Sequence, residues 1–332
     1  MKHNLYRFFY TFFRSIYFKI FGSICKYFDP PLFKNVSWGN DNPDKRFMLI
    51  RHIDRESGLC SHVLYNLGWI DYALSHGMIP IVDLQKHPTL YHKAFQFKRS
   101  NVWECFFEQP LNYKIVDIFR SKNITIRDGF GMPEVGCDLI YWRERKYFKN
   151  MYADNDSWRH YQLVCSRYIR ILPAILERYK NNEFEDALAH TGVIGVLARG
   201  TDYVKMRPSK HPIQPTTDQL IAKIKEFIVD GRLSFKIYLV TEDASIEKQF
   251  QAVFPDKLIS SRQKMIDYVD GLLVDCQGIM NNKERASAYL VAIHNLSRCP
   301  CLIAGKTAGS LTAALMSNEG QIRYFFELGD YP

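Results

Sequence analysis

The C-terminal half of the chain alternates short apolar runs with longer amphipathic segments. The runs are rich in Val, Ile and Leu, as buried strands are, and the longer segments repeat apolar residues at helical spacing. The expected strands are residues 193–198, 235–241, 257–261 and 301–305, and the expected helices are 216–231, 244–254, 286–299 and 309–317. Strands that alternate with helices in this way predict a parallel sheet.

The N-terminal half carries one similar unit. Residues 47–51 are predicted to form a buried strand, residues 61–77 an amphipathic helix closed by Gly77, and residues 78–84 a second strand. A strand, a helix and a strand in this order form a βαβ unit, so the sheet of this half is expected to be parallel too.

The segment between the two halves is less regular. Residues 101–155 mix aromatic and charged side chains and predict no element, whereas residues 158–179 predict a long helix and residues 181–192 a linker. We therefore predict an α/β fold of two Rossmann-like domains with parallel sheets and an interdomain cleft, where ligands bind. The predicted parts are an N-terminal segment 1–36, a first domain 45–185 that includes the linking helix, and a second domain 190–332.

The net charge of +9 is concentrated at the start of the chain. Five cations precede the first acidic residue, Asp29, and these are Lys2, Arg7, Arg14, Lys19 and Lys26. The rest of the chain is only mildly basic, which argues against nucleic acid as a partner.

Segment 1–36 interleaves these cations with Phe, Tyr and Ile. Arg14 and Lys19 interrupt it too early for a bilayer span, and no small-residue cleavage site follows. It predicts a basic aromatic helix at an anionic membrane surface, and thus a cytoplasmic protein held at the inner face of the cell membrane. A helix packed on the protein body or a frayed terminus is the alternative.

The eight cysteines are scattered, and only Cys299 and Cys301 are close together. That spacing is too tight for a zinc pair, so we expect reduced thiols and no metal. The turn at 302–310 resembles a Walker A loop, but Pro300 stands where that loop needs a glycine. A glycine-rich turn before a helix, which favours a phosphate, or a plain tight turn are the remaining interpretations.

Arg199 follows the first predicted strand of the second domain, where open α/β sheets bind ligands. A guanidinium there suits a diphosphate and stabilises charge on a leaving group. Lys205, Arg207 and Lys210 strengthen the positive field, and Asp202 is a candidate to orient Arg199. An arginine paired to a carboxylate for structure alone is the alternative.

Two further groups of candidates follow predicted strands. Thr241 and Glu242 are expected in the same cleft, although they also suit an ordinary helix cap. The loop after the first strand of the chain carries His52, Asp54, Glu56 and His62. One of these groups is a candidate general base, and solvated carboxylates are the alternative.

Three blocks of the second domain, residues 195–213, 237–243 and 289–316, resemble in order the fucosyltransferase superfamily with the GT-B fold, which includes core α1,6-, nodulation and protein O-fucosyltransferases. Residues 57–74 are similar to the first glycine-rich element of that family. The resemblance implies an inverting, metal-independent glycosyltransferase whose C-terminal domain binds a nucleotide sugar, GDP-fucose first of all, and whose N-terminal domain binds the acceptor.

The resemblance also implies roles for single residues. Arg199 matches the arginine that holds the β-phosphate of the donor, and Thr201 and Asp202 match the residues after it. The other matched positions are Thr241 in the nucleotide pocket, and Thr307 and Ser310 at the diphosphate. No cofactor besides the donor is implied.

The chain departs from the family pattern at three positions. Leu197 stands in place of a histidine, Gly200 in place of a second arginine, and Ala292 in place of an aspartate that reads guanine in some members. These departures leave the phosphate grip in place and put the guanine contacts in question, so another nucleotide sugar is an alternative donor.

We predict a glycosyltransferase of cell-surface polysaccharide assembly that acts on a glycan or a lipid-linked oligosaccharide. Arg199 with Lys205 or Lys210 would stabilise the departing diphosphate, and Asp54 or Glu56 would deprotonate the acceptor. A non-catalytic nucleotide- or glycan-binding protein of the same fold is the alternative. A nucleotide-binding oxidoreductase lacks support because no G-x-G-x-x-G segment follows a first strand.

Overall fold

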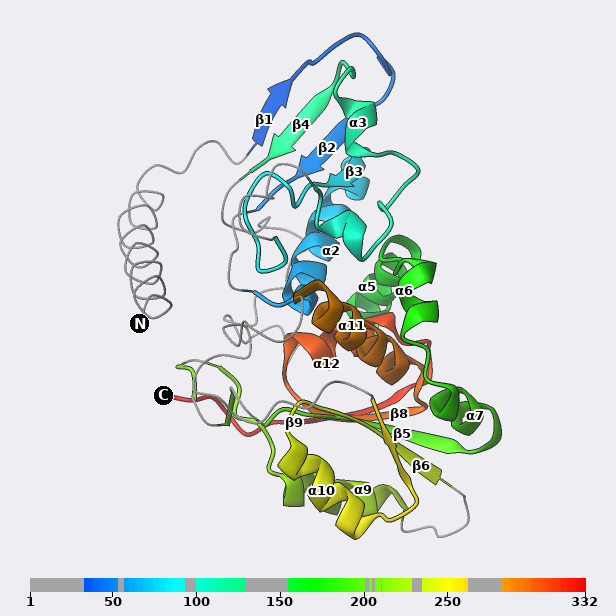
Figure 1. The fold of residues 1–332 in the computed structure, drawn as a ribbon. Coiled ribbons are helices and arrows are strands. Elements are labelled where there is room, and N and C mark those ends of the chain that lie inside the picture. The colour runs from blue at the N-terminus through cyan, green and yellow to red at the C-terminus, as the bar shows by residue number, and fades with distance from the viewer. Residues whose placement is uncertain are drawn as a thin grey trace, which may run out of the picture.

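The computed structural model contains two β-sheets with helices between them (Figure 1). It describes residues 33–52, 57–92, 100–128, 155–200, 203–204, 207–209, 211–228, 235–261 and 282–332. The basic aromatic helix predicted within segment 1–36 lies outside the described residues, except for the last four positions of that segment.

The first sheet has four strands in the order β1-β4-β2-β3. The strands are β1 (Phe33–Val36), β2 (Phe47–Ile50), β3 (Ile79–Val82) and β4 (Ile124–Arg127). β2 pairs in parallel with both β3 and β4, which confirms the predicted parallel arrangement, while β1 pairs antiparallel with β4. The edge strand β1 belongs to this sheet, whereas the sequence assigned it to the N-terminal segment, because only its two end residues are partly buried.

Helices cover both faces of the first sheet. Helix α2 (Leu59–Ser75) packs on the face that carries Met48 and Ile50, and the short helix α3 (Ile115–Ile118) packs on the opposite face. The 3-10 turn η1 (Trp103–Cys105) precedes α3 along the chain. Gly77 adopts φ +67° after α2 and lets the chain turn back into β3, as the sequence predicts.

The second sheet has five parallel strands in the order β7-β6-β5-β8-β9. The strands are β5 (Gly192–Ala198), β6 (Phe235–Thr241), β7 (Leu258–Ser260), β8 (Cys301–Gly305) and β9 (Ile322–Phe326). The four predicted strands of this half are confirmed. The sequence misses β9, an edge strand whose first residue is exposed and whose second is Arg323, so it lacks a continuous apolar run.

Helices cover this sheet on both faces as well. Helices α9 (Thr217–Ile228) and α10 (Ala244–Val253) pack on the outer face. Helices α11 (Asn282–Arg298) and α12 (Ala308–Met316) pack on the inner face, between the two sheets (Figure 1). All four predicted helices of this half are present.

The connection between the halves differs from the prediction. The single helix expected over 158–179 is two helices, α5 (Asn155–Tyr168) and α6 (Pro173–Arg178). The break has a physical cause, because Pro173 fits the first turn of a helix but not its interior. The predicted linker is helix α7 (Asn182–His190), whose N-cap Asn181 accepts a hydrogen bond from the Phe184 amide.

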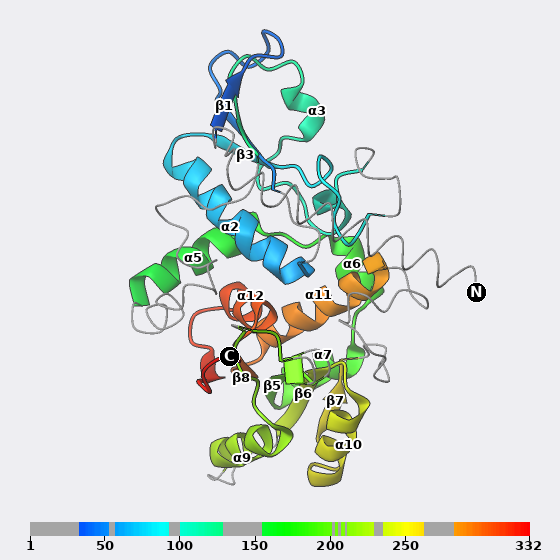
Figure 2. The same ribbon diagram turned by 90° about the vertical axis from the view of Figure 1, so that its left-hand side faces the viewer.

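One hydrophobic core joins the two halves. It runs from Trp69 and Ile70 on α2 to Leu290 on α11 and Leu311 on α12, and it reaches Leu302 in the second sheet. α2 therefore begins beside α11 and α12 (Figure 2). Buried side chains of one cluster thus join the helix of the first sheet to the helices and strands of the second.

Two remaining sequence predictions concern membrane spans and cysteines. Within the described ranges, none of the helices combines the length and the apolar character that a bilayer crossing requires. The described thiols of Cys60, Cys105, Cys165, Cys299 and Cys301 are all reduced.

Candidate active site

The strand order of the second sheet defines a topological switch point. The chain passes from β5 to β6 on one side and later to β8 on the other, so the switch lies between β5 and β8. Ala198 pairs with Thr241, and Leu197 pairs with Ala304, so the carboxyl ends of the three strands are level. Open α/β sheets bind ligands at this position, and Arg199 is the first residue after β5.

Glu242 holds Arg199 at the switch point. Its Oε1 lies 3.6 Å from Nε of Arg199 and accepts a hydrogen bond of 3.2 Å from the Gly200 amide. The two side chains are only 16% and 10% exposed. The guanidinium also lies 5.4 Å from the centre of the Tyr203 ring. Glu242 thus orients the arginine, and the predicted contribution of Asp202 stays a prediction, because Asp202 lies outside the described residues.

Elements of both halves converge on Arg199. Cys60, in the first turn of α2, lies close enough for the Arg199 charge to oppose the burial that raises the pKa of the Cys60 thiol to about 12. Tyr289 on α11 is similarly placed, since burial raises its pKa and Arg199 opposes the shift. Both groups are therefore neutral at pH 7. The described surroundings of Arg199 are largely buried, and burial strengthens the interaction of its charge with an anion.

The N-terminus of α12 lies after β8, on the other side of the switch point. Thr307 and Ser310 form a capping box: Ser310 N–H donates to Thr307 Oγ1 at 3.1 Å, and Thr307 N–H donates to Ser310 Oγ at 2.9 Å. Ser310 is fully buried and also donates to the Gly305 carbonyl oxygen at 2.7 Å. The two hydroxyls that were predicted to meet a diphosphate thus stabilise the helix start.

The amides of Ala308 and Gly309, in the first turn of α12 beside this cap, are the second feature of this position. The N–H groups of the first turn of a helix have no partner inside the helix and, with the helix dipole, attract anions. At Gly309 an added Cβ would stand 2.2 Å from the hydroxyl oxygen of Tyr289. A glycine is therefore required for α11 and the first turn of α12 to approach this closely.

Thr241 shapes the end of β6. It is 1% exposed, and its Oγ1 accepts a hydrogen bond of 3.2 Å from the Asp243 amide. Asp243 caps α10 by accepting from the Ser245 amide at 2.8 Å. The helix-cap interpretation of this segment is confirmed, and Glu242 between the two residues turns to Arg199.

The other predicted site residues lie outside the described residues. They are Asp54, Glu56, Thr201, Asp202, Lys205 and Lys210. Among the described residues, no group of three or more His, Cys, Asp and Glu side chains is placed to hold a metal ion.

Two histidines from the predicted loop and helix of the first domain form a buried pair. His52 Nε2 lies 2.7 Å from His62 Nδ1, and the residues are 4% and 1% exposed. Burial, with the nearby His62 and Arg127, lowers the pKa of His52 well below 6.5. His52 is thus a buried and neutral imidazole at pH 7, and its role as a general base stays a prediction.

A histidine–aspartate pair that the sequence did not predict lies at the edge of the first sheet. His87 Nε2 lies 2.6 Å from Oδ1 of Asp128, the residue directly after β4. Burial would raise the pKa of Asp128, but the hydrogen bond and charge of His87, with Arg51 and Lys86, lower it. The signal in the sequence is the run 124–128, ITIRD, in which a short strand ends at an aspartate much as residues 193–199 end at an arginine.

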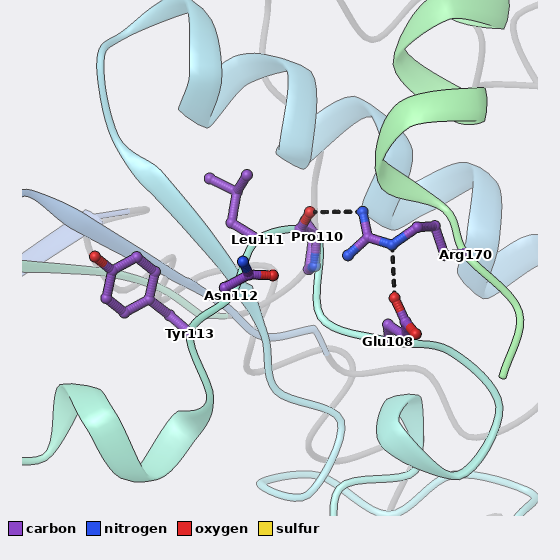
Figure 3. A pocket seen from close by; sticks show the side chains of 6 residues that line it. All are labelled: Glu108, Pro110, Leu111, Asn112, Tyr113 and Arg170. Atoms are coloured by element: carbon purple, nitrogen blue, oxygen red, sulfur yellow. Dashed lines mark hydrogen bonds and ion pairs between the residues drawn. The ribbon is translucent and has the colours of Figure 1, made fainter.

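A surface pocket of about 600 Å³ lies elsewhere on the first domain and contains none of the predicted site residues (Figure 3). Arg170 lines it and donates from Nε to Glu108 at 2.6 Å, and its terminal nitrogens donate to the carbonyl oxygens of Gln109, Pro110 and Arg167. Every nitrogen of this guanidinium is thus used to fix the loop, so Arg170 serves the structure.

Comparison with solved structures finds fucosyltransferases. NodZ α-1,6-fucosyltransferase soaked with GDP-fucose is 18% identical, with a TM-score of 0.47 over 82% of this chain and 93% of that one. Fucosyltransferase NodZ from Bradyrhizobium is also 18% identical, with a TM-score of 0.46 over 82% of this chain and 94% of that one. A variant of Arabidopsis thaliana FUT1 in complex with GDP is 8% identical, with a TM-score of 0.49 over 85% and 70% of the two chains.

No family model and no curated protein sequence matches the chain. The structural scores are all below 0.5.

Proposed function

We propose that this protein is an inverting, metal-independent glycosyltransferase that takes a sugar from a nucleotide diphosphate. One observation carries the proposal: Arg199, held by Glu242, stands at the switch point between β5 and β8, next to the N-terminus of α12. A fixed guanidinium and a helix N-terminus together form an anion site that suits the two phosphates of such a donor.

The same groups account for the chemistry. When the bond between the sugar and the diphosphate breaks, negative charge grows on the leaving β-phosphate oxygen. Arg199 is already fixed by Glu242 and partly shielded from water, so it stabilises this charge without having to reorganise. In other transferases a metal ion has this role; here we assign it to the arginine, with Lys205 or Lys210 as proposed helpers.

The departures from the family pattern bear on the nucleobase. Leu197 and Ala292 are each 1% exposed and lie in the apolar core. At Gly200, an added Cβ would stand 2.7 Å from the Asp243 side chain and 2.8 Å from Ile246. None of these positions supports contact with a base or a second guanidinium, so GDP-fucose is our leading donor on the resemblance alone.

The acceptor and the location of the reaction are proposed on weaker grounds. We propose a glycan or lipid-linked oligosaccharide acceptor in cell-surface polysaccharide assembly, with the protein held at the inner face of the membrane. The support is the basic and aromatic composition of residues 1–36. Sedimentation with anionic and with neutral vesicles tests this proposal, because binding should require the anionic lipid and should weaken with salt.

The test of the activity is release of the nucleotide diphosphate from a panel of nucleotide sugars, with water or added glycans as acceptors. We expect the wild type to turn over one donor, and Arg199→Ala to lower the rate by about 100- to 1000-fold, the usual effect of removing such a group. Arg170→Ala is the matched control, because it removes another arginine that is paired to a glutamate, and it should leave turnover unchanged.

The outcomes separate the candidate functions. A fully active Arg199→Ala variant contradicts the site. Binding of a nucleotide without turnover of any sugar would instead support the alternative, a non-catalytic nucleotide- or glycan-binding protein.

A further inference from the structure

The first sheet has a switch point of its own. The chain passes from β2 to β3 on one side and later to β4 on the other, so this switch lies between β2 and β4. The residues that follow these two strands are Arg51 and His52 after β2 and Asp128 after β4. The rule that places a ligand beside Arg199 thus points to a second ligand position beside Asp128.

The pair of His87 and Asp128 at this edge is suited to accept a proton. Asp128 Oδ1 lies 2.6 Å from His87 Nε2, and the two side chains are 34% and 21% exposed. A carboxylate at this distance holds the proton on Nε2 and leaves the lone pair on Nδ1. Asp128 remains ionised, since its pKa is lowered, and it stabilises the imidazolium that forms when His87 takes a proton.

The charges around the pair are arranged to keep it in place. Arg51 and Lys86 lie on its side of the sheet edge, and Nε of Arg51 is itself 2.6 Å from Oδ2 of the buried Asp83. Among the described residues His52 is a further titratable neighbour, and its lowered pKa keeps it neutral at pH 7. Asp128 is thus the carboxylate hydrogen-bonded to His87, while Asp83 is engaged by Arg51.

Helix α2 relates the pair to Arg199. β2 leads through residues 51–58 into α2, which begins beside α11 and α12 (Figure 2). The charge of Arg199 opposes the burial that raises the pKa of Cys60, which lies in the first turn of α2. His62 in the same turn is hydrogen-bonded to His52, and the charge of His87 adds to the burial that lowers the pKa of His52. The first turn of α2 therefore carries groups that interact with residues at both switch points.

We propose that His87, oriented by Asp128, is the base that activates the acceptor. This inference rests on the proposed glycosyltransferase function and replaces Asp54 and Glu56 as its base. The acceptor oxygen forms a bond to the anomeric carbon while its proton passes to Nδ1 of His87. The bond from that carbon to the β-phosphate oxygen breaks, and its electron pair leaves with the nucleotide diphosphate beside Arg199.

The experiment follows GDP release from GDP-fucose, with water as the acceptor, in the wild type and in His87→Gln. We expect His87→Gln to lower the rate by about 100-fold or more, as loss of a general base does, while GDP still raises the melting temperature as in the wild type. Asp128→Asn should lower the rate by less than His87→Gln does, because Asp128 acts through His87. For the same reason it should shift the low-pH side of the plot of rate against pH.

The matched control is a second histidine–aspartate pair on the surface. His160 Nε2 lies 2.8 Å from Asp71 Oδ1, and His160→Gln should turn over GDP-fucose at the wild-type rate. If His87→Gln does not fold, imidazole rescue of His87→Ala and the pH profile of Asp128→Asn serve as the readouts. A gain of rate with added imidazole is then expected.

The outcomes distinguish the two proposals. If His87→Gln turns over the donor at the wild-type rate while Asp54→Asn or Glu56→Gln does not turn it over, the assignment of the base is overturned. The proposed transferase activity then still stands. A wild type that binds GDP but does not turn over any donor overturns both.

Discussion

Arg199 Nε and Glu242 Oε1 approach to 3.6 Å across the ends of two neighbouring strands. The same oxygen accepts the Gly200 amide, so one carboxylate fixes both the guanidinium and the turn that follows β5. Glu242 is 7% exposed, and a carboxylate this buried is stable only when it is paired and hydrogen-bonded. The pair thus fixes the position of the guanidinium at the end of β5.

Two substitutions of Glu242 should separate its two roles. Glu242→Gln keeps an oxygen that can accept the Gly200 amide but removes the charge that orients Arg199, so we expect GDP affinity to fall by about tenfold, or 1.4 kcal/mol, with little loss of stability. Glu242→Ala also leaves the amide unsatisfied, and should lower the free energy of unfolding by a further 1–3 kcal/mol or so. Calorimetric titration with GDP and urea unfolding measure the two effects. Equal stability of Glu242→Gln and Glu242→Ala would argue against a stabilising role for the hydrogen bond from the Gly200 amide.

The close approach at Gly309 gives a second prediction. Gly309→Ala places a methyl group against the Tyr289 hydroxyl, and overpacking of this kind should lower the free energy of unfolding by about 1–3 kcal/mol. Tyr289→Phe removes that oxygen, so the double variant should recover part of the loss. A double-mutant cycle by urea unfolding measures the coupling. Additive effects would show that the two residues do not meet in this way.

His52 should make stability depend on pH. Its pKa is lowered in the folded protein, so the unfolded chain binds more protons, and the free energy of unfolding should fall as the pH decreases below 6.5. The slope from one such group is at most about 1.4 kcal/mol per pH unit. Urea unfolding at about pH 7.5, 6.5 and 5.5 measures this slope.

The comparison with His52→Gln isolates this group. The variant should show a smaller slope, although not a zero one, because burial lowers the pKa of His92 and His294 as well. A slope that His52→Gln leaves unchanged would assign the acid sensitivity to other histidines.

Gln162 links α5 to the end of α12. Its Nε2 donates to the carbonyl oxygens of Ala314 and Ser317 at 3.2 and 3.1 Å, and the residue is 7% exposed. Gln162→Met should leave the Ser317 carbonyl without this donor, while the Ala314 carbonyl keeps the hydroxyl of Ser317 at 2.7 Å, and it should lower the free energy of unfolding by about 1–3 kcal/mol. The exposed neighbour Leu163 provides the control, since Leu163→Ala should change stability by less than about 0.5 kcal/mol. A Gln162 variant as stable as the control would mean that the link contributes nothing.

Much of the second domain is predictable from its sequence, because its central strands are buried on both faces. Residues 237–240 and 301–305 form continuous apolar runs, and the bounds of the two strands that contain them match the predicted ones. The position of Arg199 at a strand end follows from the same pattern. Its partner does not, because which carboxylate reaches it depends on the strand order and on the turn after β6.

The first domain is less predictable for the same physical reason. β1 and β4 are short and only partly buried, so neither has a continuous apolar run, and Asp128 is not recognisable as a strand end without its neighbours. Thr307 and Ser310 show a different difficulty. Hydroxyls at a helix start suit both a cap and a phosphate, and only the three-dimensional contacts reveal that here they form the cap.

The central claim is that a nucleotide diphosphate binds beside Arg199. Calorimetric titration of GDP into the wild type, Arg199→Ala and Arg170→Ala tests it most directly. We predict that the wild type and Arg170→Ala bind GDP alike and that Arg199→Ala binds at least about tenfold more weakly, a loss of about 1.4 kcal/mol or more. GDP affinity that is equal in the wild type and Arg199→Ala would contradict the account.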